Sequence, residues 1–329
     1  MAARKRLLYS LTAAVALILL GLFLALLGRD DSRQTFQTST ISCLAVSPDG
    51  TKLALGSYDV VEICSLPVDG SLSGIRLPTL GATAISLSPG GDRLAAVGDG
   101  YELWDLDTQK RVVRSPDEDF TYTDVVFTPD GQSFACSALT VDSNTHVFRG
   151  KIELVDTQSG VLRHSIEMSD TPYAIAYSPN GDAVVAGCSQ SATLWDAVTG
   201  ERLNSLDAAE AWQVAFVAGG RQVLTAGDNV AQLWDVSTGN QISTFHVGEF
   251  YQLAVSPEGN YCATANGSLK IWDVGSGTLV QHLRGHFWGA HAVVFAPDGE
   301  TLISCGPSMQ VRMLEAPRWG SAVKFWNAR

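Results

Sequence analysis

The sequence predicts an all-β fold: a seven-bladed β-propeller of four-stranded blades, closed by an N-terminal strand and preceded by one N-terminal transmembrane helix. Three observations lead to this prediction. A turn motif recurs seven times at a nearly constant interval, a second motif follows it within each interval, and an uncharged apolar run occupies residues 7–28. A fixed period of about 40 residues with four short strands per period is typical of propeller blades.

The first motif is a four-residue turn that usually has proline at its second position and glycine at its fourth. Proline fixes the backbone at the second position of a tight turn, and glycine suits the last. The glycines that end the seven copies are Gly50, Gly91, Gly131, Gly181, Gly220, Gly259 and Gly299. Their spacings are 41, 40, 50, 39, 39 and 40 residues, so one unit carries an insertion, which we expect near residues 140–150.

The second motif is an apolar residue followed by Trp and Asp. Its clear copies contain Trp104, Trp195, Trp234 and Trp272. A second turn usually follows, as in Thr199-Gly200, in which the Asp can accept hydrogen bonds from the backbone ahead and the glycine can adopt a positive φ. Each unit therefore reads strand a, Pro-Gly turn, strand b, turn, strand c, Asp-Gly turn and strand d.

These repeats resemble the WD-repeat β-propeller family, and the resemblance extends from about residue 33 to the C-terminus. The Gly-His dipeptide of that family appears once, as Gly285-His286. The resemblance implies a rigid ring. It also implies that the residues at the mouth of the central channel often contact a partner.

The last unit lacks a strand d of its own. We expect its strand a near residues 291–295, its strand b near 301–305 and its strand c near 321–326, after an insertion at 306–320. Residues 33–39 precede the first strand a, so they are expected to supply the missing strand d. Phe36 would then lie beside Phe325 and Trp326, and the pairing would remove two open sheet edges.

The N-terminal run is long enough to cross a bilayer, because residues 7–28 at 1.5 Å per residue span about 33 Å against a hydrocarbon core of about 30 Å. An uncleaved signal anchor is favoured over a cleaved signal peptide, whose apolar region is normally about 7–15 residues long. The expected domains are a basic tail (1–6), a transmembrane helix (7–28), a linker (29–32) and the propeller (33–329).

Charge next to this run predicts its orientation. Arg4, Lys5 and Arg6 precede it, whereas Arg29 and Arg33 follow it. The excess of cations before the run predicts a single-pass membrane protein with a cytoplasmic N-terminus and an extracytoplasmic propeller, whether periplasmic, lumenal or extracellular.

The composition limits the classes of partner and cofactor that are expected. The net charge is −12, with no basic run in the propeller, which argues against nucleic acid as a partner. The six cysteines fall in predicted strands of mostly different blades, so we expect buried thiols. No motif indicates a metal or a cofactor.

The candidate site is found by counting eight residues back from each turn-ending glycine, to the start of strand a. The occupants are Ser42, Thr83, Thr123, Tyr173, Trp212, Tyr251 and His291. Four consecutive units thus carry an aromatic ring at the channel mouth, and Glu210 and Glu249 stand two residues before Trp212 and Tyr251. We expect this arc to bind a partner, with Trp212 and Tyr251 as anchors and the two glutamates favouring a basic ligand. The other interpretation is that the rings merely pack the loops.

The leading functional hypothesis is a membrane-anchored, non-catalytic scaffold that binds an unidentified protein or peptide. A linker of four residues reaches at most about 14 Å, so the arc is expected on the membrane-distal face. The first alternative is an enzyme, such as a hydrolase or a quinone-type dehydrogenase, with its site at the channel mouth. The second is a sensor that binds a small ligand there.

Overall fold

The computed structural model describes residues 34–37, 41–66, 74–79, 81–115, 119–141, 148–208, 210–266, 268–283, 290–306 and 310–315. These residues form strands β1 to β28 and one short 3-10 helix, η1 (Ala218–Gly220).

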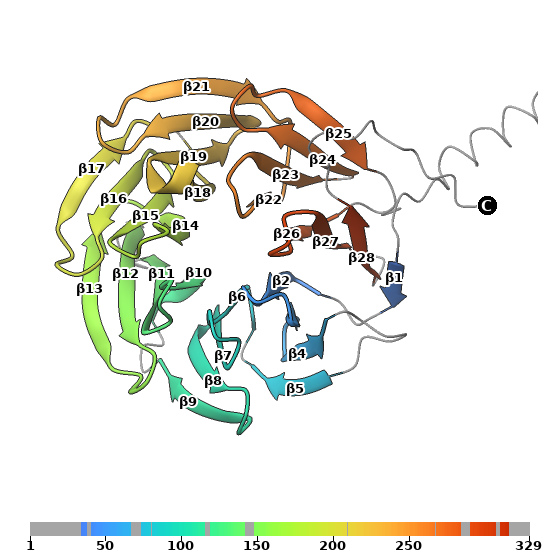
Figure 1. Ribbon diagram of the computed structural model, residues 1–329. Helices are drawn as coiled ribbons and strands as arrows, with labels where there is room; N and C mark the ends of the chain where they lie inside the picture. Colours follow the sequence, from blue (N-terminus) through green and yellow to red (C-terminus); the bar gives the residue numbers. More distant parts are fainter. Residues whose placement is uncertain are drawn as a thin grey trace, which may run out of the picture.

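Six antiparallel sheets are each built from four consecutive strands, and we number them as blades 1 to 6 in chain order (Figure 1). Blade 1 contains β2 (Cys43–Val46), β3 (Lys52–Gly56), β4 (Val60–Ser65) and β5 (Gly74–Pro78); blade 2 contains β6 (Ala84–Leu87), β7 (Arg93–Gly98), β8 (Gly100–Asp105) and β9 (Lys110–Arg114). Blade 3 contains β10 (Thr121–Phe127), β11 (Ser133–Val141), β12 (Phe148–Asp156) and β13 (Leu162–Met168); blade 4 contains β14 (Pro172–Tyr177), β15 (Ala183–Cys188), β16 (Ala192–Asp196) and β17 (Arg202–Leu206). Blade 5 contains β18 (Gln213–Val217), β19 (Gln222–Gly227), β20 (Val230–Asp235) and β21 (Gln241–His246); blade 6 contains β22 (Gln252–Val255), β23 (Tyr261–Asn266), β24 (Ser268–Asp273) and β25 (Leu279–Leu283).

A further four-stranded sheet, the closing sheet, joins the two ends of the chain. It contains β26 (Ala292–Phe295), β27 (Thr301–Gly306) and β28 (Gln310–Glu315), and β1 (Gln34–Gln37) pairs with β28 as its outer strand. Its inner strand β26 contacts both β22 and β2, so the sheets form a ring around a central axis (Figure 1).

The position predicted for the last strand c is wrong. Phe36 pairs with Val311 rather than with residues near Phe325 and Trp326, and β28 starts soon after Gly306 instead of after an insertion at 306–320. A short connection between paired strands loses less chain entropy than a long one. Residues 321–326 lie outside the described part of the chain.

The predicted architecture of a transmembrane helix followed by seven blades is wrong. In the described ranges no helix is long and apolar enough to cross a membrane, and the run at 7–28 lies outside those ranges. A single-pass membrane location is accordingly not supported. The structure supports an all-β propeller with six blades of consecutive strands and a closing sheet made from both chain ends.

The two turn motifs fold as predicted. The N–H of Gly50 donates to the carbonyl of Ser47 at 2.8 Å with φ at +71°. In the Asp-Gly turn after β12, the carboxylate of Asp156 accepts the N–H of Ser159, and Gly160 has φ at +70°. A Cβ on Gly160 would also lie 2.6 Å from Val113 of blade 2, so this glycine lets neighbouring blades pack closely.

The hydrophobic core is divided into layers between neighbouring sheets. One layer, for example, joins Val61 and Leu77 of blade 1 to Ile85 and Leu94 of blade 2. All six cysteines are free and buried within these layers, as predicted. Burial raises the pKa of Cys64 to about 11 and that of Cys43 to about 12, so the thiols stay protonated.

Candidate partner-binding face

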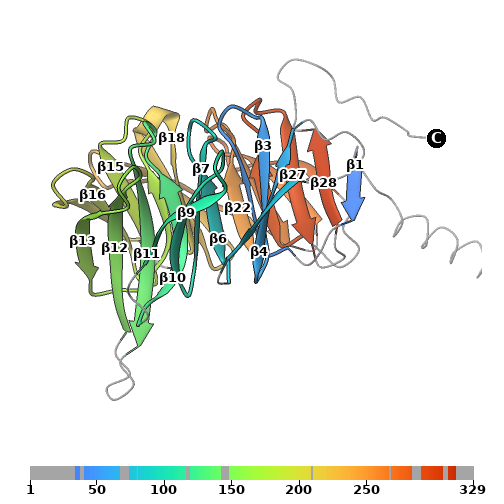
Figure 2. The same ribbon diagram turned by 90° about the horizontal axis from the view of Figure 1, so that it is seen from below.

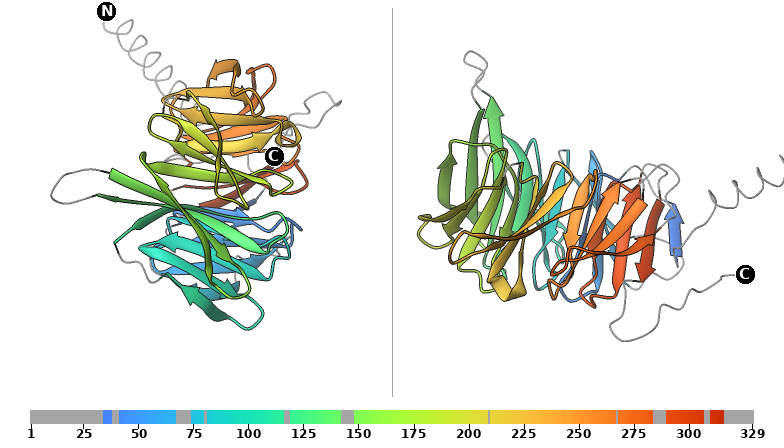
Figure 3. Two further views of the ribbon diagram at one scale, coloured as in Figure 1. Left: turned by 90° about the vertical axis from the view of Figure 1, so that its left-hand side faces the viewer. Right: turned by 90° about the horizontal axis from the view of Figure 1, so that it is seen from above.

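The antiparallel order of each blade places the d–a loops and the b–c turns at one end of the ring, and we call this end the mouth face. Strand a of every blade starts there and runs to the Pro-Gly turns at the opposite end. Figures 2 and 3 show the ring edge-on, with the long β11–β12 hairpin marking the mouth face.

The three small residues at the mouth positions hold neighbouring blades together. The hydroxyl of Ser42 donates to the carbonyl of Ala82 at 2.9 Å, and that of Thr83 donates to the carbonyl of Tyr122 at 3.1 Å. The hydroxyl of Thr123 reaches the next blade in the same way, at 3.0 Å from the carbonyl of Pro172. These hydroxyls are structural, because each is used by a backbone carbonyl.

The four aromatic residues at the mouth positions are solvent-exposed. Trp212 is 42% exposed and Tyr251 is 64% exposed, and Tyr173 and His291 are also exposed. The structure brings two of these rings together: those of Tyr251 and His291 meet edge to face, with centroids 5.0 Å apart. The backbone beneath them is fixed, because the N–H groups of both residues donate to carbonyls of strand b at 2.8 Å.

The two glutamates lie on the same face as the arc. Glu210 adopts a left-handed φ of +55°, which is uncommon for a residue with a side chain. Its N–H donates to the carbonyl of Ser189, and its carbonyl accepts the N–H of Trp212 at 2.9 Å. This tight turn therefore holds the main chain of Glu210 close to that of Trp212. Glu249 is exposed, and neither carboxylate forms an ion pair within the described residues.

Other exposed charges on the mouth face are mostly acidic. The exposed acids in its described loops and turns include Asp59, Asp99, Asp119, Asp207 and Asp228, whereas Arg149 is an exposed cation there. Many aspartates at the opposite end, such as Asp156, accept hydrogen bonds within their own turns. The mouth face therefore presents a negative surface around the arc.

Two further aromatic residues lie on this face and were not predicted from the repeats. Tyr58 is 80% exposed in the b–c turn of blade 1, and Phe148 is 56% exposed in the β11–β12 hairpin. The five large exposed aromatic side chains of the described ranges are Tyr58, Phe148, Tyr173, Trp212 and Tyr251, and all lie on the mouth face. The large exposed aliphatic side chains of the same ranges lie near the opposite end, apart from Val141. Because the b–c turns follow no repeated motif, the spacing of the repeats could not predict Tyr58 or Phe148.

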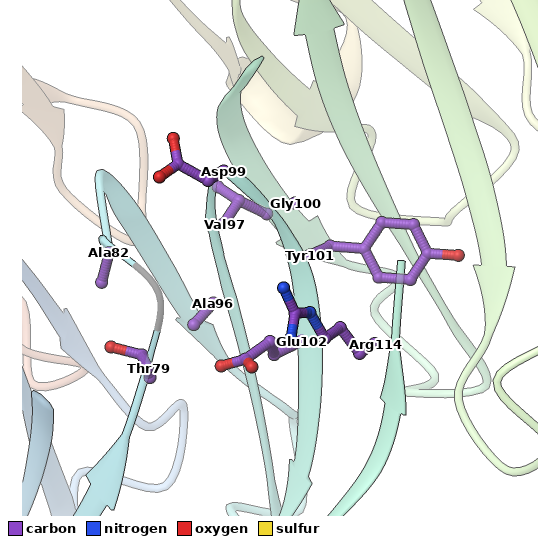
Figure 4. Close-up of a pocket in the computed structure, with 9 residues that line it drawn as sticks. All are labelled: Thr79, Ala82, Ala96, Val97, Asp99, Gly100, Tyr101, Glu102 and Arg114. Carbon is purple, nitrogen blue, oxygen red and sulfur yellow. The ribbon is translucent and has the colours of Figure 1, made fainter. Parts of the chain in front are cut away.

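A small pocket lies between blades 1 and 2 near the same face (Figure 4). Thr79 and Ala82 form one side, and Ala96, Glu102 and Arg114 lie on the other. It encloses about 230 Å³ with its opening included, which is below the roughly 300–1,000 Å³ typical of small-molecule sites. The carboxylate of Glu102 is already paired with Arg111 at 2.7 Å. This pocket therefore adds no support for a small-ligand sensor.

One carboxyl group lies at the contact between blades 3 and 4, one residue after the mouth position Thr123. Asp124 accepts the N–H of Val125 at 2.8 Å and the N–H of Ile175, in the next blade, at 2.9 Å. Burial raises the pKa of this carboxyl to about 6. Its contacts hold blades 3 and 4 together, so it has the same structural role as the three hydroxyls.

The ring of four-stranded blades, with Trp-Asp motifs on its c strands, is typical of WD-repeat β-propellers. The repeat family described as WD domain, G-beta repeat matches residues 31–59, 239–273 and 277–313, and the predicted resemblance is confirmed. Propellers of this class are typically protein-interaction scaffolds.

The fold is similar to the crystal structure of the Cps50 (Swd1) β-propeller domain of Myceliophteria thermophila. The TM-score is 0.72 at 22% sequence identity, and the match covers 87% of this chain and 99% of that one. This likeness concerns the fold alone. None of the curated proteins matches the chain in sequence.

Proposed function

We propose that this protein is a non-catalytic interaction scaffold whose mouth face binds a basic segment of a protein or peptide. The observation that carries the proposal is the gathering on one face of exposed aromatic rings and of exposed carboxylates that form no ion pair among the described residues, at Tyr173, Trp212, Tyr251, His291, Glu210 and Glu249. Large rings on fixed backbone are the side chains that interface hot spots favour.

The chemistry of the arc suits arginine or lysine. A guanidinium or ammonium group is attracted to the face of an aromatic ring, and the attraction is stronger where a carboxylate lies nearby. Glu210 and Trp212 belong to one tight turn, and Glu249 precedes Tyr251 by two residues, so each pair carries a carboxylate and an aromatic ring on neighbouring main chain. Since the backbone N–H groups of Trp212, Tyr251 and His291 are already hydrogen-bonded, the main chain at these positions needs little ordering on binding.

The arrangement supports binding better than catalysis. An acid–base mechanism needs titratable groups within hydrogen-bond reach of one another. At the described mouth positions, His291 contacts a tyrosine ring, and the hydroxyls of Ser42, Thr83 and Thr123 are bound to backbone carbonyls.

The proposal is tested by selecting peptides from a random displayed library against the full chain. We expect the selected peptides to be enriched in arginine and lysine and to bind less tightly as salt increases. Binding of one selected peptide is then measured by calorimetry to Trp212→Ala and Tyr251→Ala. Each truncation should cost about 2 kcal/mol or more, roughly thirty-fold in Kd.

The matched control is Ile242→Ala, which removes an exposed side chain near the opposite end of blade 5 and should leave Kd unchanged. Circular dichroism checks that each variant is folded. Selected peptides without basic residues, or folded arc variants that bind as wild type, would contradict the proposed function.

A further inference from the structure

We propose that the β11–β12 hairpin forms one wall of this binding site, where the Val141–Phe148 pair contacts an apolar residue of the bound segment. The inference rests on the proposed function of the mouth face. It adds a second requirement to the ligand, namely an apolar residue beside the basic ones.

The hairpin reaches further from the ring than the b–c turns of the other blades. In blade 2 the pairing between strands b and c ends four residue pairs after Leu94–Trp104, at Gly98–Gly100. In blade 3 the equivalent first pair is Phe134–Val155, and four pairs later comes Ala138–Lys151. Three more pairs follow, the last of which is Val141–Phe148. At about 3.4 Å per residue, the hairpin projects about 10 Å beyond the neighbouring turn. Figures 2 and 3 show this projection.

The pair lies on the side of the hairpin that faces the arc. A Cβ on Gly150 would lie 2.3 Å from Cδ of Pro172 and 2.4 Å from the carbonyl oxygen of Asp170, so this side of β12 packs against the loop that leads into blade 4. Alternate residues of a strand share a side. Phe148 is two residues from Gly150, and Val141 is its direct partner. Tyr173, the first ring of the arc, follows Pro172 directly.

The opposite side of β12 confirms this alternation. Lys151 lies on that side, and its ammonium group is 4.0 Å from the centroid of the Phe120 ring. By the same alternation Arg149 lies on the Lys151 side, away from the arc. The last described pair of the hairpin therefore presents apolar side chains on the side that faces blade 4.

The occupant follows from this division of charge. The carboxylates of Glu210 and Glu249 lie on blades 5 and 6 and attract cationic side chains, whereas the last described pair of the hairpin places valine and phenylalanine on the side that faces blade 4. A cross-strand pair of an aromatic and a β-branched residue is also a stable, well-ordered surface. We infer that a bound segment places an apolar side chain against the hairpin and its basic side chains further along the arc.

The test uses one peptide from the displayed library, bound to the full-length chain. Phe148→Ser and Val141→Thr should each weaken binding, about tenfold for Phe148→Ser. Replacing the apolar residue of the peptide by alanine should cause a similar loss with the wild-type protein and almost none with Phe148→Ser. The matched control is Leu203→Ser, which replaces a side chain that is 55% exposed near the opposite end of blade 4.

The outcomes separate the two proposals. If Trp212→Ala weakens binding but Phe148→Ser does not, the hairpin is no part of the site, although the arc still is. Both variants could also weaken binding while the loss from Phe148→Ser and the loss from the alanine substitution in the peptide simply add. In that case Phe148 does not contact the apolar residue, and the inference is wrong. If neither variant changes Kd, the proposed function itself fails.

Discussion

The indole N–H of Trp234 donates a 2.9 Å hydrogen bond to the hydroxyl of Thr225, one strand away within blade 5. Blade 6 repeats the relationship, with Trp272 donating to Thr264 at 3.1 Å. In blade 4 the indole N–H of Trp195 is buried and has no hydrogen-bond partner among the described residues. The register explains the difference: the threonine lies two residues beyond the partner of each tryptophan, and in blade 4 that position is Ala186.

Ala186→Thr should therefore be more stable than Ala186→Val. The two side chains have nearly the same shape, but only the threonine can accept the N–H of Trp195. We expect a difference of about 1 kcal/mol, the usual net value of a buried hydrogen bond. Urea unfolding of both variants measures it. Equal stabilities would show that the indole N–H is satisfied in another way.

Thr83→Val should lower the stability of the ring. The substitution removes the hydroxyl that bonds the carbonyl of Tyr122 in the next blade and the carbonyl of Val97 in its own. Loss of these bonds should cost about 1 kcal/mol or somewhat more. Thr121→Val, at an exposed position of β10, is the control and should change the melting temperature little. If both variants melt alike, the bond between blades does not contribute.

Lys151→Met should be strongly destabilising. The ammonium group of Lys151 lies 2.9 Å from the carboxylate of Glu153, and both side chains are buried. Glu153 also accepts the hydroxyl of Tyr122 at 2.6 Å. Removing one partner leaves a buried charge, at a typical cost of about 3–5 kcal/mol.

The control for Lys151→Met is Arg163→Met, which removes the more exposed partner of Asp156 and should cost at most about 1 kcal/mol. Urea unfolding compares the two variants. A cost for Lys151→Met as small as that for Arg163→Met would mean that water reaches Glu153.

Stability should pass through a maximum at mildly acidic pH. The pKa of Asp124 is raised by burial to about 6, above its usual value near 3.8, so its ionised form disfavours folding and stability rises as the pH falls from above 6 toward 4. In contrast, the hydroxyl of Ser47 and the backbone of Thr51 lower the pKa of Asp49 to about 2, and turn hydrogen bonds lower those of Asp196 and Asp235. The stability that these ionised groups contribute is lost as the pH falls below about 4.

Melting temperatures across pH 3 to 8 test this expectation. Asp124→Asn has no titrating group at that position, so it should lose the rise between pH 6 and 4 and keep the fall below 4. A wild-type rise that persists in Asp124→Asn would assign it to another group.

The local motifs could be predicted from the sequence because their interactions join residues only a few positions apart. Gly50 bonds Ser47, and Asp156 bonds Ser159, whatever the rest of the chain does. These turns repeat with one period, so they also predicted the four-stranded units and the four aromatic mouth positions. The last strand was placed wrongly because two segments after β27, residues 310–315 and residues 321–326, could each have been its strand c. The order of residues alone does not give the entropy lost by the loop that connects the strands.

The sequence by itself determined the turns, the strand period and which residues occupy the start of each strand a. Only the tertiary structure decided what those residues do, since their partners lie 39 to 49 positions away, as with Thr83 and Tyr122 or Thr123 and Pro172. In the closed propeller, the hydroxyls at one half of the mouth donate hydrogen bonds between blades. The aromatic side chains of Trp212 and Tyr251, in the other half, stay exposed. Closing the ring also placed Tyr58 and Phe148 on that same face, because exposure depends on which neighbours cover a side chain, and those neighbours come from distant parts of the chain.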